Sequence, residues 1–87
     1  CKVYKGGEEV SLSPLEYRLL LYLIENRNHV LSKEQILERI WDSDGKYVDS
    51  NTVSVNISRL RTKIEEDPSA PMMIRTVHGI GYIWMEE

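Results

Sequence analysis

The sequence predicts a small α+β domain in which an antiparallel hairpin precedes three helices and a second hairpin. Apolar residues alternate around a glycine pair near the start, and capped amphipathic segments fill the middle of the chain. β-branched and aromatic residues flank a glycine near the end. A chain of 87 residues has room for one core, so we expect a single domain over residues 1–87.

The first hairpin is expected within residues 2–12. Gly6-Gly7 lies at its centre, and glycine supplies the positive φ that a tight turn requires. The first helix should begin after Ser13, because Pro14 suits the first helical position and Glu16 completes a Ser-x-x-Glu capping box. Its predicted apolar face consists of Tyr17, Leu20, Leu21 and Ile24, and residues 26–28 should end it.

Ser32 and Gln35 predict a capping box at the start of the second helix. Its buried stripe should contain Ile36, Leu37 and Ile40, with Trp41 at its end. Residues 42–49 contain Asp-Gly and are typical of an irregular loop.

The third helix should begin near Asp49 or Ser50 and run to about Asp67, because prolines follow. Residues 72–85 then predict a strand, a turn at His78-Gly79 and a second strand. The second and third helices are candidates for a helix-turn-helix, although the loop between them is longer than usual.

The net charge of −3 argues at first against a nucleic-acid partner. Residues 50–64, however, contain three basic residues and no acidic one, so a locally basic helix lies on an acidic body. Screening limits repulsion from charges more than about 10 Å away at about 0.1 M salt. On charge alone, phosphate binding and simple solvation of the helix remain equal alternatives.

Composition also bounds the location of the protein. The longest apolar run, residues 19–24, is too short to span a bilayer, and no leader opens the chain. Cys1 is the single cysteine, which excludes an internal disulfide and indicates a reducing compartment. We therefore expect a cytoplasmic protein without membrane attachment, and a start at Cys1 indicates a piece of a longer chain.

No pattern indicates an enzyme, a metal site or a cofactor. His29 and His78 are the histidines, and no His/Cys spacing, nucleophile triad, P-loop or dinucleotide fingerprint is present. The adjacent acids Glu65, Glu66 and Asp67 are interpreted as solvated charges at a helix end.

The third helix has a surface beyond what its core requires. Its predicted buried stripe consists of Val53, Ile57, Leu60 and Ile64. A second stripe, about a quarter-turn away, consists of Thr52, Asn56, Arg59 and Lys63, with Val55 beside it and Asn51 at the helix start. Arginine and asparagine can pair with purine edges in a major groove, and valine or threonine methyls can meet thymine.

Further contacts to duplex DNA are expected around this helix. Ser54, Ser58 and Arg61 lie on the opposite flank, where hydroxyl and guanidinium groups commonly reach phosphates. In the terminal hairpin, His78-Gly79 could enter a minor groove while Arg75 and Thr76 approach the backbone, although an exposed bystander His78 remains an alternative.

The chain resembles the effector domain of the OmpR/PhoB family of response regulators. The resemblance rests on residues 12–17, 31–37, 53–64 and 74–82, which cover nearly the whole chain in the family's order. It implies a winged helix-turn-helix with an N-terminal antiparallel sheet, here truncated, three helices and a C-terminal hairpin wing. It also implies that the receiver domain phosphorylated by a sensor kinase is absent here.

The resemblance further implies roles for individual residues. Thr52, Val55, Asn56 and Arg59 would face bases, and Asn51, Ser58, Arg61, Thr76 and Tyr82 would lie nearer the backbone. The long loop would help contact RNA polymerase, which makes candidates of Trp41, Asp42, Asp44 and Lys46. The isolated domain is expected to be a monomer that binds direct-repeat DNA as a head-to-tail dimer.

Two departures from the family pattern qualify these roles. His78 stands where arginine is usual, and Asn51 and Ser58 stand where basic residues are frequent. The acidic net charge and altered wing favour a rival interpretation, a protein-interaction module that docks RNA polymerase with little DNA contact. RNA binding is less favoured, because no exposed aromatic pair on a sheet is predicted.

Overall fold

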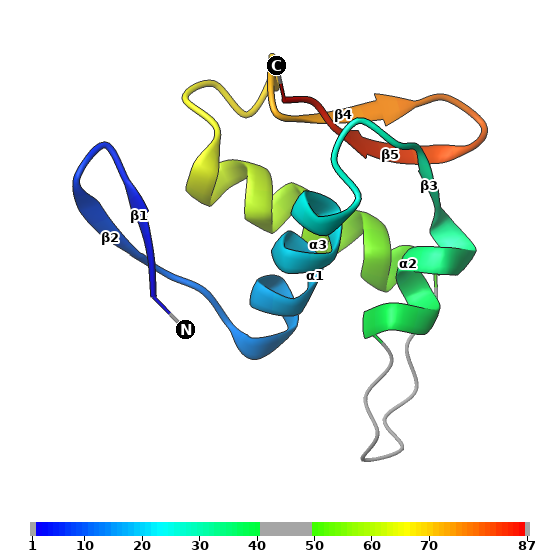
Figure 1. Cartoon of the computed structure of the whole chain (residues 1–87), viewed down its shortest axis with the longest axis horizontal. Coiled ribbons are helices and arrows are strands. Elements are labelled where there is room, and N and C mark those ends of the chain that lie inside the picture. The colour runs from blue at the N-terminus through cyan, green and yellow to red at the C-terminus, as the bar shows by residue number, and fades with distance from the viewer. Residues whose placement is uncertain (1, 41–49, 87) are drawn as a thin grey trace.

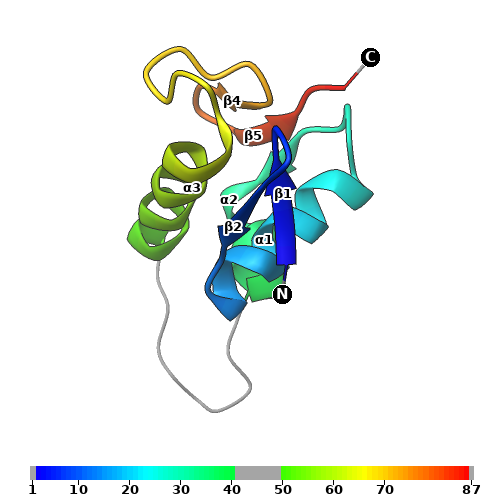
Figure 2. The same cartoon turned by 90° about the vertical axis from the view of Figure 1, so that its left-hand side faces the viewer.

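The computed structural model describes residues 2–40 and 50–86, with a hairpin on one side of three helices and a three-stranded sheet on another (Figures 1 and 2). The elements are β1 (Lys2–Lys5), β2 (Glu8–Ser11), α1 (Pro14–Glu25), β3 (Leu31–Ser32), α2 (Lys33–Ile40), α3 (Ser50–Ile64), β4 (Ile74–Val77) and β5 (Gly81–Trp84). The predicted order of hairpin, three helices and hairpin is confirmed.

Local chemistry positions the first hairpin and α1 as predicted. Lys5 pairs with Glu8, and Gly6 and Gly7 have φ values of 57° and 84° between them. Two consecutive positive φ angles make a turn whose twist matches the flanking strands. At α1, the backbone N–H of Glu16 donates to Ser13 Oγ while the Glu16 carboxylate accepts from the Ser13 N–H, which completes the capping box.

The strand β3 was not predicted from the sequence. Leu31 pairs with Tyr82 and Ser32 with Gly81, so the terminal hairpin becomes a sheet of order β3-β5-β4. Ser32 also forms the predicted capping box with Gln35. A two-residue strand has no periodicity, and its partner lies far along the chain, so no local pattern marks it.

The predicted apolar face of α1 is wrong by one position. Leu21 is 44% exposed, whereas Glu16, Leu19, Leu20 and Leu23 are the buried residues of this helix. Both sets follow the same helical spacing, because leucines occupy three consecutive positions, 19–21. Packing against α2 and α3 selects the face that carries Glu16.

The predicted stripe of α3 is confirmed, since Val53, Ile57 and Leu60 are at most 1% exposed. These side chains join one core with α1, α2 and the sheet, through residues that include Ile36, Ile40, Ile74 and Tyr82. Figure 2 shows α3 along one side of the molecule, and α1 and α2 pack against it from within, which leaves an outer face of α3 uncovered.

The end of α3 differs from the prediction in two ways. The helix stops at Ile64, three residues before Asp67. Glu65, predicted to be solvated, is 3% exposed, and its carboxylate accepts backbone N–H groups at 2.8–3.2 Å from residues 72–74. Asp67 accepts from the Ser69 hydroxyl and N–H, and these hydrogen bonds lower the pKa of Asp67 below its ordinary 3.8. Glu65 and Asp67 therefore stabilise the connection between α3 and β4.

Candidate nucleic-acid interface

The outer face of α3 is polar except for one valine. Asn51, Ser58 and Arg59 are exposed, and Thr52 is half-buried. Val55 is 45% exposed, which agrees with its predicted place outside the apolar stripe. The face therefore offers a guanidinium, an amide, a hydroxyl and valine methyls to whatever lies against the helix.

Two members of the predicted outer stripe do not lie on this face. Asn56 is 4% exposed, and its Nδ2 donates to the Thr52 carbonyl at 2.8 Å. Lys63 places Nζ 2.6 Å from Glu16 Oε1 and 2.9 Å from the Ser11 carbonyl. The expectation of a continuous exposed stripe is thus wrong at Asn56, which is buried, and Lys63 is half-buried beside its partners Glu16 and Ser11.

The carboxylate of Glu16 explains why Lys63 turns away from the outer face of α3. Glu16 lies on the inward face of α1, where its side chain is 5% exposed. Burial acts to raise the pKa of Glu16, but hydrogen bonds from Lys63 and Ser13 and the lysine charge outweigh it, so the net pKa is lowered. A charged carboxylate at this depth needs a cation, and Lys63 supplies it. The sequence signal was present, since Glu16 continues the spacing of Leu19, Leu20 and Leu23.

Arg61 links α3 to the wing, which we define as residues 74–84. Its Nε and Nη2 donate to the Ile74 carbonyl at 3.0 and 2.9 Å, and Nη2 also donates to Thr76 Oγ1 at 2.9 Å. The guanidinium carbon lies 5.7 Å from the centre of the Tyr82 ring. These contacts anchor a half-buried side chain that was predicted to reach phosphates.

The wing carries the other predicted residues. Arg75, Thr76 and His78 are exposed, and Gly79 has a φ of 78° in the turn. The Tyr82 ring is buried, with its hydroxyl 3.5 Å from Ser54 Oγ, so Ser54 and Tyr82 meet where the helix joins the wing. Ile80 in the same turn is 56% exposed, and no pattern in the sequence had marked it as a surface residue.

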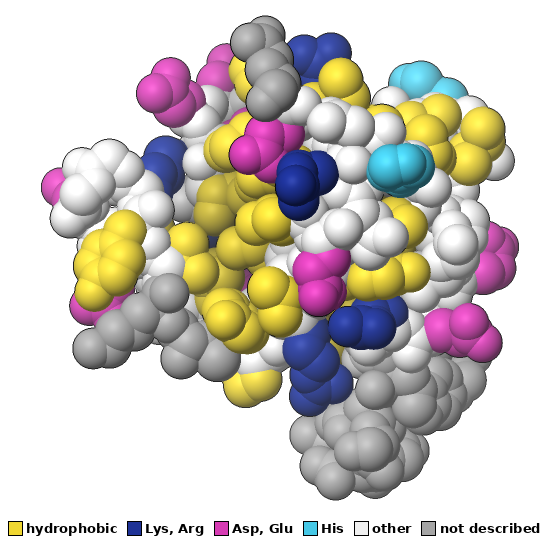
Figure 3. Space-filling model, in the orientation of Figure 1, with side chains coloured by type: hydrophobic (Ala, Val, Ile, Leu, Met, Phe, Trp, Pro, Cys, Tyr) yellow, Lys and Arg dark blue, Asp and Glu magenta, His cyan; other side chains and the backbone are white. Residues whose placement is uncertain are grey.

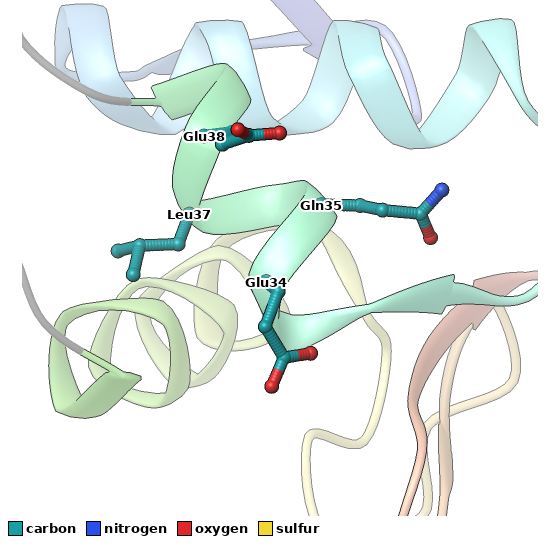
Figure 4. A pocket seen from close by; sticks show the side chains of 4 residues that line it. All are labelled: Glu34, Gln35, Leu37 and Glu38. Atoms are coloured by element: carbon teal, nitrogen blue, oxygen red, sulfur yellow. The ribbon is translucent and has the colours of Figure 1, made fainter.

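Two hollows are lined mainly by residues outside α3. One is lined by Glu34, Gln35, Leu37 and Glu38, and Figure 4 shows Leu37 and Gln35 leaving α2 on opposite sides. The carboxylates of this hollow repel phosphate. The other is the apolar groove between the β1–β2 hairpin and the helices, where Figure 3 shows hydrophobic side chains gathered. Arg59 lines neither hollow.

Four residues predicted from the sequence as polymerase contacts cannot be placed relative to this interface. Trp41, Asp42, Asp44 and Lys46 lie outside the described residues. Within residues 2–40 and 50–86, no three His, Cys, Asp or Glu side chains converge as metal ligands. No helix in that part of the chain is long and apolar enough to cross a membrane.

Comparison with known proteins places this arrangement in a family. The family described as "Transcriptional regulatory protein, C terminal" matches residues 7–84. The response regulator GtcR of Aneurinibacillus migulanus is 47% identical over 83 residues, which are 94% of this chain and 34% of that protein. The chain thus spans about a third of the length of such relatives.

Solved structures agree with the sequence relatives. The response regulator DrrB, an OmpR/PhoB homologue from Thermotoga maritima, superposes with a TM-score of 0.88 at 34% identity, covering 98% of this chain and 38% of that one. The DNA-binding domain of Klebsiella pneumoniae RstA, solved in complex with the RstA box, has a TM-score of 0.80 at 30% identity, covering 97% and 82%.

The match over nearly the whole chain and the shared fold lead to one assignment. The chain belongs to the family of C-terminal domains of transcriptional regulatory proteins, and it is a winged-helix effector domain of the OmpR/PhoB type, a non-enzymatic DNA-binding output domain of response regulators.

Proposed function

We propose that this domain recognises a specific duplex DNA sequence with α3 in the major groove and the wing near the adjacent minor groove. The observation that carries the proposal is the outer face of α3, which is free of acidic residues and presents Val55 and Arg59 outward. An α-helix with its side chains is about 10–12 Å across, so α3 fits a major groove about 12 Å wide.

The residues divide by the chemistry they offer. Arg59 can fork onto guanine O6 and N7, while Val55 and the Thr52 methyl can meet thymine. Asn51 and Ser58 are exposed beside them and suit phosphate oxygens. Asn56 and Lys63 would serve the fold instead, because Asn56 Nδ2 donates to the Thr52 carbonyl and Lys63 Nζ binds Glu16 Oε1.

The wing adds a second region of contact. Arg75 and Thr76 suit the sugar-phosphate backbone, and His78 at the turn suits the minor groove when protonated. Tyr82 contributes through its hydroxyl at the helix–wing junction. Arg61 lies at that junction as well, within reach of Thr76.

Further proposals concern the longer protein to which this domain would belong. Relatives about three times as long are named response regulators, so this domain would act as the output of a receiver domain controlled by a sensor kinase. Two domains on direct repeats would place their α3 helices about one helical turn of DNA apart in a head-to-tail dimer. RNA polymerase would be the protein partner of the α2–α3 connection.

The test is selection of binding sites from a random duplex library at moderate salt. A short enriched motif, repeated at about one helical turn, is the expected result. The rival function, docking of RNA polymerase without DNA recognition, is favoured by the net charge of −3 and by the acidic hollow beside α2. A folded domain that enriches no motif at any salt concentration would support that rival.

A further inference from the structure

Two side chains near the C-terminal end of α3 bind the backbone N–H and the backbone carbonyl of one residue in β4. The Ile74 N–H donates to Glu65 Oε2 at 2.8 Å, and the Ile74 carbonyl accepts from Arg61 Nε and Nη2. Ile74 is itself fully buried. The start of the wing is therefore fixed to α3 by a carboxylate on its donor side and a guanidinium on its acceptor side.

This attachment matters because β4 is an edge strand. The sheet order is β3-β5-β4, so β5 is the neighbour of β4 among the described strands. An edge strand without a second neighbour relies on side chains for its unpaired groups. Arg61 meets this need at the Ile74 carbonyl, and it also binds the neighbouring Thr76 side chain at Oγ1.

The position of Arg61 also connects the two surfaces of the proposed interface. It lies two residues after Arg59 on α3, and it bonds Thr76, which is next to Arg75 on the wing. We propose that Arg61 is a positioning residue that fixes the wing relative to α3, so that the wing contributes to DNA affinity only while Arg61 holds it. This inference rests on the proposed DNA recognition.

The geometry requires arginine rather than any cation. Nε and Nη2 of the planar guanidinium converge on one carbonyl, and its face lies over the Tyr82 ring. A lysine carries the same charge as a single point and cannot reproduce the fork. Arg61→Lys therefore separates the loss of positioning from the loss of charge.

The first arm of the test uses the 87-residue chain without DNA. Backbone hydrogen exchange should accelerate at Arg75, Val77 and Ile80 in Arg61→Lys and Arg61→Ala, because these N–H groups face β5 or the turn and the edge strand loses its anchor. Arg59→Ala is the matched control on the same helix and should leave wing exchange unchanged. Unchanged wing protection in both Arg61 variants would overturn the proposal, whatever the DNA result.

The second arm measures DNA affinity in a double-mutant cycle between position 61 and the wing. With the selected duplex, Arg75→Ala should weaken the wild type but have little further effect in Arg61→Lys, a coupling of at least about threefold. In the control cycle of Arg59→Ala with Arg75→Ala, the fold-losses of DNA affinity should multiply, since those side chains share no partner. If the Arg61 variants only lowered the stability of the whole domain, the fold-losses of affinity would multiply in both pairs, and the positioning role would be refuted.

The two arms separate this inference from the proposed function. If the wild type enriches no DNA motif, the proposed function fails, while the exchange arm still reports whether Arg61 holds the wing. If Arg61→Lys binds DNA like the wild type and Arg61→Ala lowers the salt dependence by about one phosphate, Arg61 acts by direct contact, and the positioning role is refuted.

Discussion

Lys63 Nζ lies 2.6 Å from Glu16 Oε1 and joins α3 to the first turn of α1. The same ammonium group donates to the Ser11 carbonyl, so three segments meet at one charge. Because the capping box also uses the Glu16 carboxylate, the start of α1 and the end of α3 share one polar cluster. Within the cluster the Glu16 carboxylate is buried, whereas Lys63 is half-buried and Ser11 is exposed.

Lys63→Met should destabilise the domain without removing a DNA contact. The substitution leaves the buried Glu16 carboxylate without its cation, and we expect a loss of about 1–3 kcal/mol, kept modest because the lysine side chain is 36% exposed. Urea unfolding measures this change. The exposed Lys33 provides the control, since Lys33→Met should be near neutral. A stable Lys63→Met whose DNA binding has a weaker salt dependence would instead identify Lys63 as a phosphate ligand.

Glu16 should make stability depend on pH in acid. Its pKa in the folded state lies below the ordinary value of 4.5, so its contribution is fully present above about pH 4.5. The contribution is lost as the pH falls through the lowered folded value, because the unfolded chain then binds the proton more readily. Urea midpoints between neutral and acid pH should fall less steeply for Glu16→Gln than for the wild type. Asp67→Asn is the companion variant, because the Asp67 pKa is lowered as well. Parallel curves for Glu16→Gln and the wild type would contradict this assignment.

Arg59→Ala should remove a base contact. Loss of a bidentate pair costs about 1–3 kcal/mol on the selected duplex and relaxes preference at one base pair. Competition binding with single-position variants of the motif measures both effects. Arg39, which lies over the Tyr22 ring on the α1–α2 side, supplies a control that should not alter preference. Equal weakening on specific and random DNA would move Arg59 to the backbone.

Gly81→Ala should disrupt the junction between β3 and β5. An added Cβ would lie 1.9 Å from the Leu31 carbonyl oxygen, so the strands must separate, at a cost of at least about 1–3 kcal/mol. Gly79→Ala is the comparison within the same hairpin. It meets no atom within 4 Å but has a φ of 78°, and its cost should be smaller, about 1–2 kcal/mol. Thermal unfolding should rank Gly81→Ala as the less stable variant, and the reverse order would show that β3 can yield.

His78→Arg should tighten DNA binding if the wing approaches the minor groove. Arginine places a permanent cation where the wing would meet the negative potential of the groove, so affinity should rise. Competition binding on the selected duplex measures the change, with His78→Ala as the comparison. Lys33 and Glu34 line the same hollow as His78, so Glu34→Gln is needed to separate their effects. Equal affinities of His78→Arg, His78→Ala and the wild type would leave the histidine outside the interface.

The amino-acid sequence by itself determined the features whose causes are local. Ser13 with Glu16 and Ser32 with Gln35 form the predicted capping boxes, and Gly6-Gly7 forms the predicted turn. These interactions span four residues or fewer, so neighbours in the chain supply both partners. The spacing of Val53, Ile57 and Leu60 likewise predicted a buried stripe, because helical geometry alone places them on one side.

Tertiary structure decided the features that need a partner from elsewhere in the chain. Two faces of α1 fit the same spacing, and packing of the other helices buried Glu16 in place of Leu21. Lys63 and Arg61 look alike in sequence as basic residues of one helix, yet one is bound by Glu16 and the other by Ile74. Those partners lie 47 and 13 residues away, and no periodicity records such distances. Charge and spacing identified the helix, but only the packing around it determined which of its side chains remain on the surface.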